Sequence, residues 1–172
     1  MRLLIHSPEF PPGPGGIGTH AYHIADQLCH LGHEVLVVTP QDYIDPATAG
    51  TFNRKQPFEV IRLDHIEPPL LEAVQRFRIL GRITRKWKPD LLLATGDKAA
   101  WIVCLLSGSF RVPWMAVGHG TEFGGGLTMK NRVTRWALNR ANGVVCVSNY
   151  TSEVMHTLGI TPKMETVIHN GA

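Results

Sequence analysis

The sequence predicts an α/β domain of Rossmann-like type, in which a doubly wound, mostly parallel sheet of about seven strands is covered by helices. Short apolar runs alternate along the chain with segments of helical period, which is typical of strand–helix–strand units. The charged fraction is 18%, below the ~25% of an ordinary globular domain, as expected where strands are buried on both faces. A length of 172 residues suits one domain with a substantial core and is short for two.

The first part of the chain predicts a complete strand–helix–strand unit. A short apolar strand at residues 3–5 leads through a Gly/Pro-dense loop into a helix over 17–31, which Gly32 ends. Residues 34–39 (EVLVVT) form a β-branched run typical of a strand buried on both faces. Residues 41–57 have no clear period, so we expect a surface excursion there.

The same alternation continues to the end of the chain. We expect helices over 70–88, 98–106, 129–141 and 151–158, and strands over 58–63, 90–95, 112–118, 143–148 and 165–168. Ligands of such sheets bind beyond the carboxyl ends of the strands, and the first strand should be central. Four residues should therefore lie near that edge: Gly16, Asp97, His119 and Ser148.

Composition and charge exclude several classes of protein. The net charge of +3 is far below that of a dedicated nucleic-acid-binding protein, so no nucleic-acid partner is expected. The apolar start is too short for a signal peptide, and the longest apolar run, residues 99–106, is far below the ~18 residues that span a bilayer. Cys29, Cys104 and Cys146 lie in apolar segments without metal-ligand spacing, so we expect buried thiols and a cytoplasmic protein.

The strongest local signal is the loop PPGPGGIGTH at residues 11–20. Its glycines remove side chains where a helix begins, which bares the first backbone amides and the positive end of the helix dipole. An anionic group such as a phosphate is the expected ligand. A tight turn without a ligand is the alternative.

A dinucleotide cofactor is a competing interpretation of this loop, because Gly13, Gly15 and Gly18 match the pattern GxGxxG. The chain would then be an NAD(P)-type oxidoreductase domain. Against this, residues 7–12 separate the first strand from the first glycine, whereas the dinucleotide fingerprint starts almost directly after the strand. The second predicted strand also ends in Thr39-Pro40, with no carboxylate placed to accept a ribose hydroxyl.

Four blocks of sequence together resemble the N-terminal domain of the GT-B glycosyltransferases of family 4. They are residues 11–40, Lys88-Pro89-Asp90, residues 117–122 (VGHGTE) and residues 144–153 (VVCVSNYTSE). The closing His169-Asn170-Gly171-Ala172 is similar to the turn that leads into that family's second domain. The resemblance implies that residues 1–172 form one acceptor-side domain and that the C-terminal nucleotide-sugar-binding domain is absent from this chain.

The resemblance also implies an activity. A retaining glycosyltransferase would move a sugar from a nucleotide-sugar donor to a hydroxyl of a glycan, lipid or small-molecule acceptor, with no obligatory metal or cofactor. The isolated half is expected to be inactive. A sugar- or phosphate-binding module without catalysis is the non-enzyme alternative.

By position, the resemblance assigns roles to residues at the predicted sheet edge. Gly16, with the adjoining Gly15 and Ile17 amides, corresponds to the loop that approaches the donor diphosphate, where amide donors would stabilise charge on the leaving group. His119 corresponds to the histidine beside the transferred sugar and is the expected catalytic residue. The candidates for contact with the acceptor or the cleft are His20, Asp97, Glu122 and Ser148.

Several of these candidates have structural alternatives. Asp97 suits an N-cap of the next helix, Glu122 suits a turn cap, and Ser148 suits a turn after its strand. The helix over 70–88 carries six basic residues, one acid and an apolar stripe. It is either a crossover helix with a solvated basic face or an amphipathic helix in peripheral contact with an anionic membrane.

Overall fold

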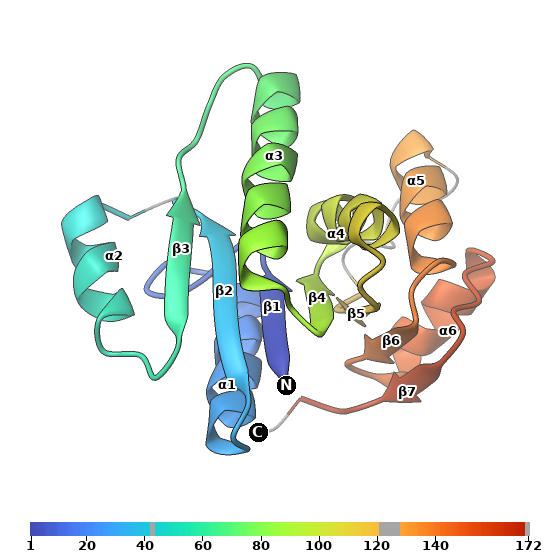
Figure 1. The fold of residues 1–172 in the computed structure, drawn as a ribbon. Coiled ribbons are helices and arrows are strands. Elements are labelled where there is room, and N and C mark those ends of the chain that lie inside the picture. Colours follow the sequence, from blue (N-terminus) through green and yellow to red (C-terminus); the bar gives the residue numbers. More distant parts are fainter. Residues whose placement is uncertain (42–43, 121–127, 171–172) are drawn as a thin grey trace.

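The computed structural model describes residues 1–41, 44–120 and 128–170, which form seven strands and six helices (Figure 1). The strands are β1 (Arg2–His6), β2 (Glu34–Pro40), β3 (Glu59–Leu63), β4 (Leu91–Thr95), β5 (Trp114–Gly118), β6 (Gly143–Cys146) and β7 (Glu165–Val167). The helices are α1 (Gly16–His30), α2 (Pro46–Asn53), α3 (Pro69–Trp87), α4 (Asp97–Phe110), α5 (Met129–Leu138) and α6 (Asn149–Thr157).

All neighbouring strands pair in parallel, in the order β3-β2-β1-β4-β5-β6-β7. The predicted doubly wound sheet is confirmed, and β1 lies inside it between β2 and β4. From β1 the chain moves outwards to β2 and β3, then returns to β4 and continues in the other direction. The strand order therefore reverses between β1 and β4, which is where ligands of such sheets bind.

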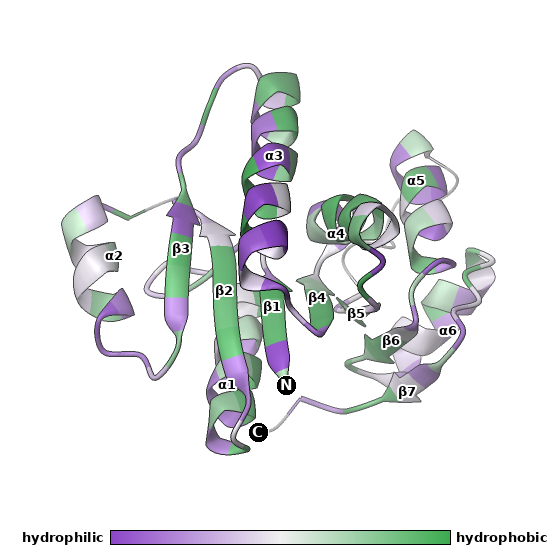
Figure 2. Ribbon diagram, in the orientation of Figure 1, coloured by the Kyte–Doolittle hydropathy of each residue, from purple (hydrophilic) through white to green (hydrophobic). Residues whose placement is uncertain are grey.

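Two apolar cores cover the two faces of the sheet. Leu4, Leu36 and Leu92 point to one face, where they pack with residues of α3, α4, α5 and α6. Their strand neighbours Leu3 and Val35 point to the other face, against α1 and α2. Figure 2 shows the interior strands as hydrophobic along most of their length, as expected for strands buried on both faces.

Helix α3 packs on the sheet over only part of its length. Phe77, Leu80 and Ile83 contact the core, which confirms a crossover helix. The first turns rise beyond the sheet (Figure 1), and there Leu70 and Leu71 are 75% and 56% exposed. Contact of residues 70–88 with a membrane stays a prediction. None of the helices in the described part of the chain combines the length and apolarity needed to cross a membrane.

Two sequence expectations about helices are wrong. Residues 46–53, expected to be an irregular excursion, form α2, which Asp45 caps by accepting a hydrogen bond from Thr48 N at 2.9 Å. Helix α4, expected over residues 98–106, continues to Phe110, and the ring of Phe110 packs against the core.

None of the three cysteines, all of which lie in the described part of the chain, forms a disulfide. Cys104 and Cys146 are buried, whereas Cys29 is only half-buried, because it lies near the end of α1 beside the carbonyl of Pro57. Burial raises the pKa of the Cys29 and Cys104 thiols. Both are therefore poor nucleophiles near neutral pH.

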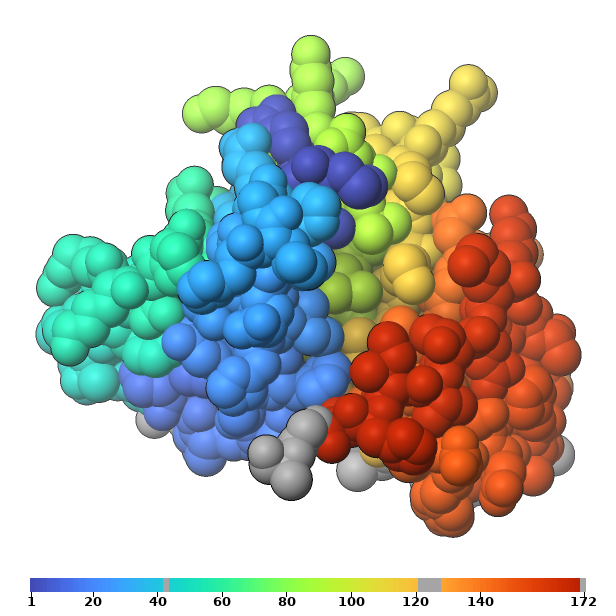
Figure 3. All heavy atoms as spheres, turned by 90° about the horizontal axis from the view of Figure 1, so that it is seen from below, coloured from blue at the N-terminus to red at the C-terminus, as the bar shows by residue number. Residues whose placement is uncertain are grey.

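The beginning of β1 is tied to its two neighbouring strands. Arg2 N donates to Asp90 Oδ2 at 2.8 Å, just before β4, and the Arg2 guanidinium pairs with Glu34 of β2 at 3.1 Å. The same guanidinium stacks over Trp87 at 4.7 Å. Figure 3 views the molecule from this side, with the N-terminal residues in dark blue close to α1.

Candidate functional site

The four residues predicted to share one edge of the sheet do so. Gly16 begins α1 after β1, and Asp97 begins α4 after β4. His119 directly follows β5, and Ser148 caps α6 after β6. These strands are consecutive neighbours in the sheet, so their carboxyl ends place the four residues along one edge.

Gly15, Gly16 and Gly18, at the start of α1, differ in the structural reason for the absence of a side chain. Gly15 has φ of 131°, and a Cβ there would lie 2.0 Å from Glu9 Oε2. A Cβ on Gly18 would lie 2.9 Å from the backbone of Glu9 and Phe10. Around Gly16, by contrast, no described atom beyond its chain neighbours and the backbone of its own helix lies within 4 Å of the Cβ position. The positive φ requires glycine at 15 and the neighbouring backbone requires it at 18, whereas the space beside Gly16 is open.

Helix α1 begins without a side-chain cap and without an acidic residue in its first turn. Its first helical bond is Thr19 N to the Gly15 carbonyl at 3.1 Å, so the amides of Gly16, Ile17 and Gly18 have no partner inside the helix. Such amides and the helix dipole together favour an anion.

Buried and partly buried polar contacts hold this loop in place at two points. Thr95 Oγ1 of β4 donates to Ser7 Oγ at 2.8 Å, and Ser7 Oγ donates to the Glu9 carbonyl at 2.6 Å. Further along, Arg62 of β3 donates to the Pro11 carbonyl and to Asn53 Oδ1 of α2. The loop is therefore fastened to strands on both sides of β1.

His119 lies against His20, which comes from the second turn of α1. Their ring centroids are 5.0 Å apart and the rings are nearly perpendicular, at 89°. Burial, with a smaller contribution from His20, lowers the pKa of His119 from 6.5 to about 4. Burial, then His23, also lowers the pKa of His20. Near pH 7 His119 is thus a neutral imidazole.

The remaining predicted residues have structural contacts. Gly96, not Asp97, is the N-cap of α4, so the expected cap role of Asp97 is wrong. Asp97 instead pairs with Lys130 of α5 at 2.7 Å. Ser148 caps α6 by accepting from Thr151 N at 3.1 Å, which is a structural role. Glu122 lies outside the described residues.

A pocket of about 690 Å³ opens between the carboxyl ends of β1, β2, β3 and β4. It is lined by Pro8, Glu9, Ile17, Gln41, His65, Glu72, Arg76, Asp97 and Lys98. Of these, only Ile17 and Asp97 were identified as site residues from the sequence. The spacing of Glu72 and Arg76, four apart on α3, was the available signal, but it is also the spacing of an ordinary surface ion pair.

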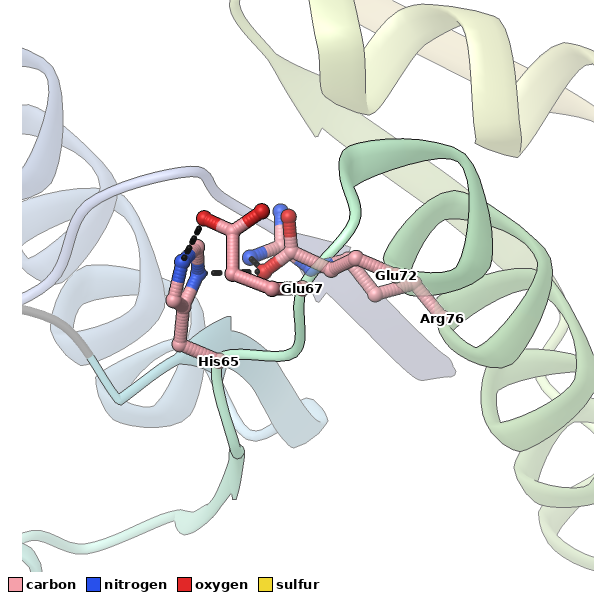
Figure 4. Close-up of polar contacts among 4 residues, drawn as sticks. All are labelled: His65, Glu67, Glu72 and Arg76. Carbon is pink, nitrogen blue, oxygen red and sulfur yellow. Dashed lines mark hydrogen bonds and ion pairs between the residues drawn. The ribbon is translucent and has the colours of Figure 1, made fainter.

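A charged cluster forms one wall of this pocket (Figure 4). Glu72 Oε1 accepts from His65 Nδ1 at 2.9 Å and pairs with Arg76 at 2.5 Å. His65 Nε2 pairs with Glu67 at 3.3 Å. The hydrogen bonds to Glu72 and then to Glu67 raise the pKa of His65. Within the described ranges, no group of three or more His, Cys, Asp or Glu side chains is placed to hold a metal ion.

Comparison with known protein sequences gives one family over nearly the whole chain. The sequence model described as Glycosyltransferase Family 4 matches residues 14–172. Glycogen synthase from Mycobacterium tuberculosis, in two strains, is 26% identical over 203 residues that cover 99% of this chain and 48% of the relative. The chain thus spans about half the length of the curated relatives it matches.

Solved structures share the fold at low sequence identity. Anabaena Alr3699/HepE, determined in complex with UDP or UDP-glucose, gives a TM-score of 0.74 at 21% identity and covers 100% of this chain and 44% of that one. Sucrose-phosphate synthase from Thermosynechococcus elongatus gives a TM-score of 0.78 at 16% identity, with 99% and 48% covered. The seven-stranded domain therefore shares its fold with slightly less than half of each of these longer chains.

Proposed function

This chain belongs to glycosyltransferase family 4, and from that premise we propose that it is the acceptor-side half of a retaining glycosyltransferase. It would help to move a sugar from a nucleotide-sugar donor to an acceptor hydroxyl. A second domain would hold most of the donor. The length of the matched relatives and the UDP and UDP-glucose complexes of Alr3699/HepE support this proposal.

The observation that carries the proposal is the open space beside Gly16. Backbone conformation accounts for Gly15 and packing against the backbone accounts for Gly18, but neither explains the lack of a side chain at Gly16 among the described residues. A ligand that comes close to the backbone explains it. The amides of the first turn of α1, which have no partner among the described residues, select an anion, and the diphosphate of the donor is such an anion.

The chemistry of the reaction suits this arrangement. When the bond between the sugar and the diphosphate breaks, negative charge grows on the leaving phosphate, and fixed amide donors stabilise that charge without reorganisation. His119 would act at the sugar. Because its pKa is about 4, it stays neutral and can donate one hydrogen bond to a sugar hydroxyl without adding charge. The perpendicular ring of His20 limits how His119 can turn.

The decisive experiment tests transfer directly. The chain, produced together with its donor-binding domain, is incubated with UDP-glucose, ADP-glucose or GDP-mannose and with a panel of acceptor sugars. We expect release of the nucleoside diphosphate and a product with the anomeric configuration of the donor, read by NMR. An inverted product would refute retention.

Two further results would refute more of the proposal. Nucleotide-sugar binding without any transfer or hydrolysis would favour a non-catalytic binding module. Binding of NADH in place of nucleotide sugars would favour the oxidoreductase interpretation.

A further inference from the structure

Apart from Ile17, the pocket beside the glycine loop is lined by residues other than those proposed to act on the donor. It lies on the β2 and β3 side of the loop, and it shares Ile17 with the first turn of α1. A molecule bound there would be adjacent to the proposed diphosphate site. The volume of about 690 Å³ lies within the range of small-molecule pockets, about 300–1,000 Å³.

Most of the charges that line this pocket are already paired within the protein. Arg76 and His65 both contact Glu72 Oε1, and Asp97 pairs with Lys130. Two charged residues of the lining, the cation of Lys98 and the carboxylate of Glu9, have no ion-pair partner among the described residues. The lining thus lacks the excess of positive charge that a phosphorylated ligand would need.

The groups that are left for a ligand are mainly hydrogen-bond acceptors. Glu72 uses Oε1 for both of its protein contacts, so Oε2 has none among the described residues. Gln41 donates through Nε2 to the Ile44 carbonyl at 2.7 Å, which leaves its side-chain oxygen to accept. Carboxylate and amide oxygens that face a pocket are suited to ligands rich in hydroxyl donors.

Two positioning residues prepare Glu72 for such a ligand. Arg76 is one helical turn further along α3, and His65 comes from the β3–α3 connection, so Glu72 is held from two elements (Figure 4). The Glu72 side chain is only 13% exposed. Charge-assisted hydrogen bonds on one oxygen fix the direction of the other. The wall of the pocket is therefore a fixed acceptor for a ligand hydroxyl.

We propose that this pocket is the acceptor subsite and that it takes a neutral sugar or polyol, whose hydroxyls donate to Glu72, Gln41 and Glu9 and accept from Lys98. The inference rests on the proposed glycosyl transfer and names its acceptor class. Pro8 and Ile17 supply apolar surface for the C–H face of a sugar ring. A fatty chain would desolvate Glu72 Oε2 and the Glu9 carboxylate, which have no described partner, without offering them a hydrogen-bond donor.

The test compares three probe acceptors in the protein that carries the donor domain. They are methyl α-glucoside, glucose 6-phosphate and an alkyl alcohol such as decanol. We expect transfer to the neutral glucoside with the highest kcat/KM. The Glu72→Gln variant should raise the KM for this acceptor about tenfold or more, because an ionised acceptor is lost. The donor KM and the slow hydrolysis of the donor by water should stay within about twofold.

A matched control and a second variant distinguish a loss of acceptor binding from a loss of the fold. Glu153→Gln changes an exposed glutamate of α6 with no described contact and should leave the KM for the glucoside unchanged. Lys98→Ala removes an exposed side chain outside the Glu72 cluster, so it should keep the fold and still raise the KM for the glucoside. Thermal unfolding of each variant reports on folding.

Binding of the glucoside gives a readout that does not depend on transfer. In ligand-observed NMR with the chain, methyl α-glucoside should show saturation transfer that Glu72→Gln and Lys98→Ala both weaken. Unchanged binding and unchanged KM in both variants would overturn the proposed subsite, as would a clear preference for glucose 6-phosphate or decanol. Absence of donor hydrolysis and of transfer, with glucoside binding intact, would instead refute the proposed function.

Discussion

Replacing Ser7 with alanine should destabilise the domain at the base of the glycine loop. Ser7 Oγ accepts a hydrogen bond from Thr95 and donates one to the Glu9 carbonyl. Both Ser7 and Thr95 are fully buried, so water has no access to replace the lost oxygen. The alanine variant leaves the Thr95 hydroxyl and the Glu9 carbonyl without these partners.

The size of the effect follows from these two contacts. Orphaning the buried Thr95 hydroxyl costs about 1–3 kcal/mol, and losing the bond to Glu9, at the half-buried loop, costs about 0.5–1.5 kcal/mol. We therefore expect Ser7→Ala to lower the free energy of unfolding by about 1.5–4.5 kcal/mol. Thr95→Val should cost less, about 0.5–1.5 kcal/mol, because Ser7 keeps its bond to Glu9. The double variant leaves neither hydroxyl without its partner, because both hydroxyls are removed. Its loss of unfolding free energy should therefore be smaller than the sum of the losses in the two single variants.

Urea unfolding followed by tryptophan fluorescence measures these differences, with the fully buried Trp114 as a reporter. Thr39→Val is the matched control in β2, since the buried Thr39 hydroxyl has no hydrogen-bond partner in the described part of the chain. That variant should be neutral or more stable. A Ser7→Ala loss below about 0.5 kcal/mol, or strict additivity in the double variant, would refute the reasoning.

Three further predictions concern the site and the response to pH. Gly16→Val should raise the donor KM and lower kcat without changing the stability. Gly108→Val, at a position that also has open space, is the control and should leave the donor KM and kcat unchanged. Equal kinetic effects of the two variants would contradict the role of Gly16. His119→Ala should lower kcat by about 10²- to 10³-fold with a smaller rise in donor KM, and a kcat within about threefold of the parent would leave His119 a structural residue. Burial lowers the pKa of His6 to about 4, so the unfolded chain takes up a proton between about pH 6.5 and 4 that the folded chain does not. The free energy of unfolding should therefore fall through that window, by on the order of 3 kcal/mol from His6. His6→Asn, which keeps a donor for the Val38 carbonyl, should lose less between pH 7 and 4.5 in urea titrations, and parallel curves would contradict this.

The sheet could be predicted from the sequence because strands buried on both faces leave a direct signal. EVLVVT at residues 34–39 has no polar residue between its first and last positions, and it is β2. Helix α2 could not be found in the same way, since Ala49 is its one fully buried residue and so it has almost no apolar period. Its Asp45-Pro46 start was a signal, but one that also begins ordinary turns.

The candidate site was only partly predictable, for a similar physical reason. Gly16, Asp97 and His119 follow apolar runs directly, so topology places them at the sheet edge. The acceptor pocket instead combines Glu9, Gln41 and Glu72 from segments that no local pattern connects. Only the crossover of α3 over the sheet brings Glu72 towards the β1–α1 loop.

The position of β1 has a consequence for how the chain folds during synthesis. β1 is the first strand to be made, yet its second partner is β4, and the bonds from Arg2 to Asp90 and from Thr95 to Ser7 each close a loop of 88 residues. At about 5–20 residues per second, a ribosome needs roughly 5–20 s to supply that partner. During this interval an apolar strand edge is open to wrong pairing, since parallel long-range contacts form slowly. We expect the nascent chain to stay sensitive to proteases until β4 has emerged and to become resistant soon afterwards.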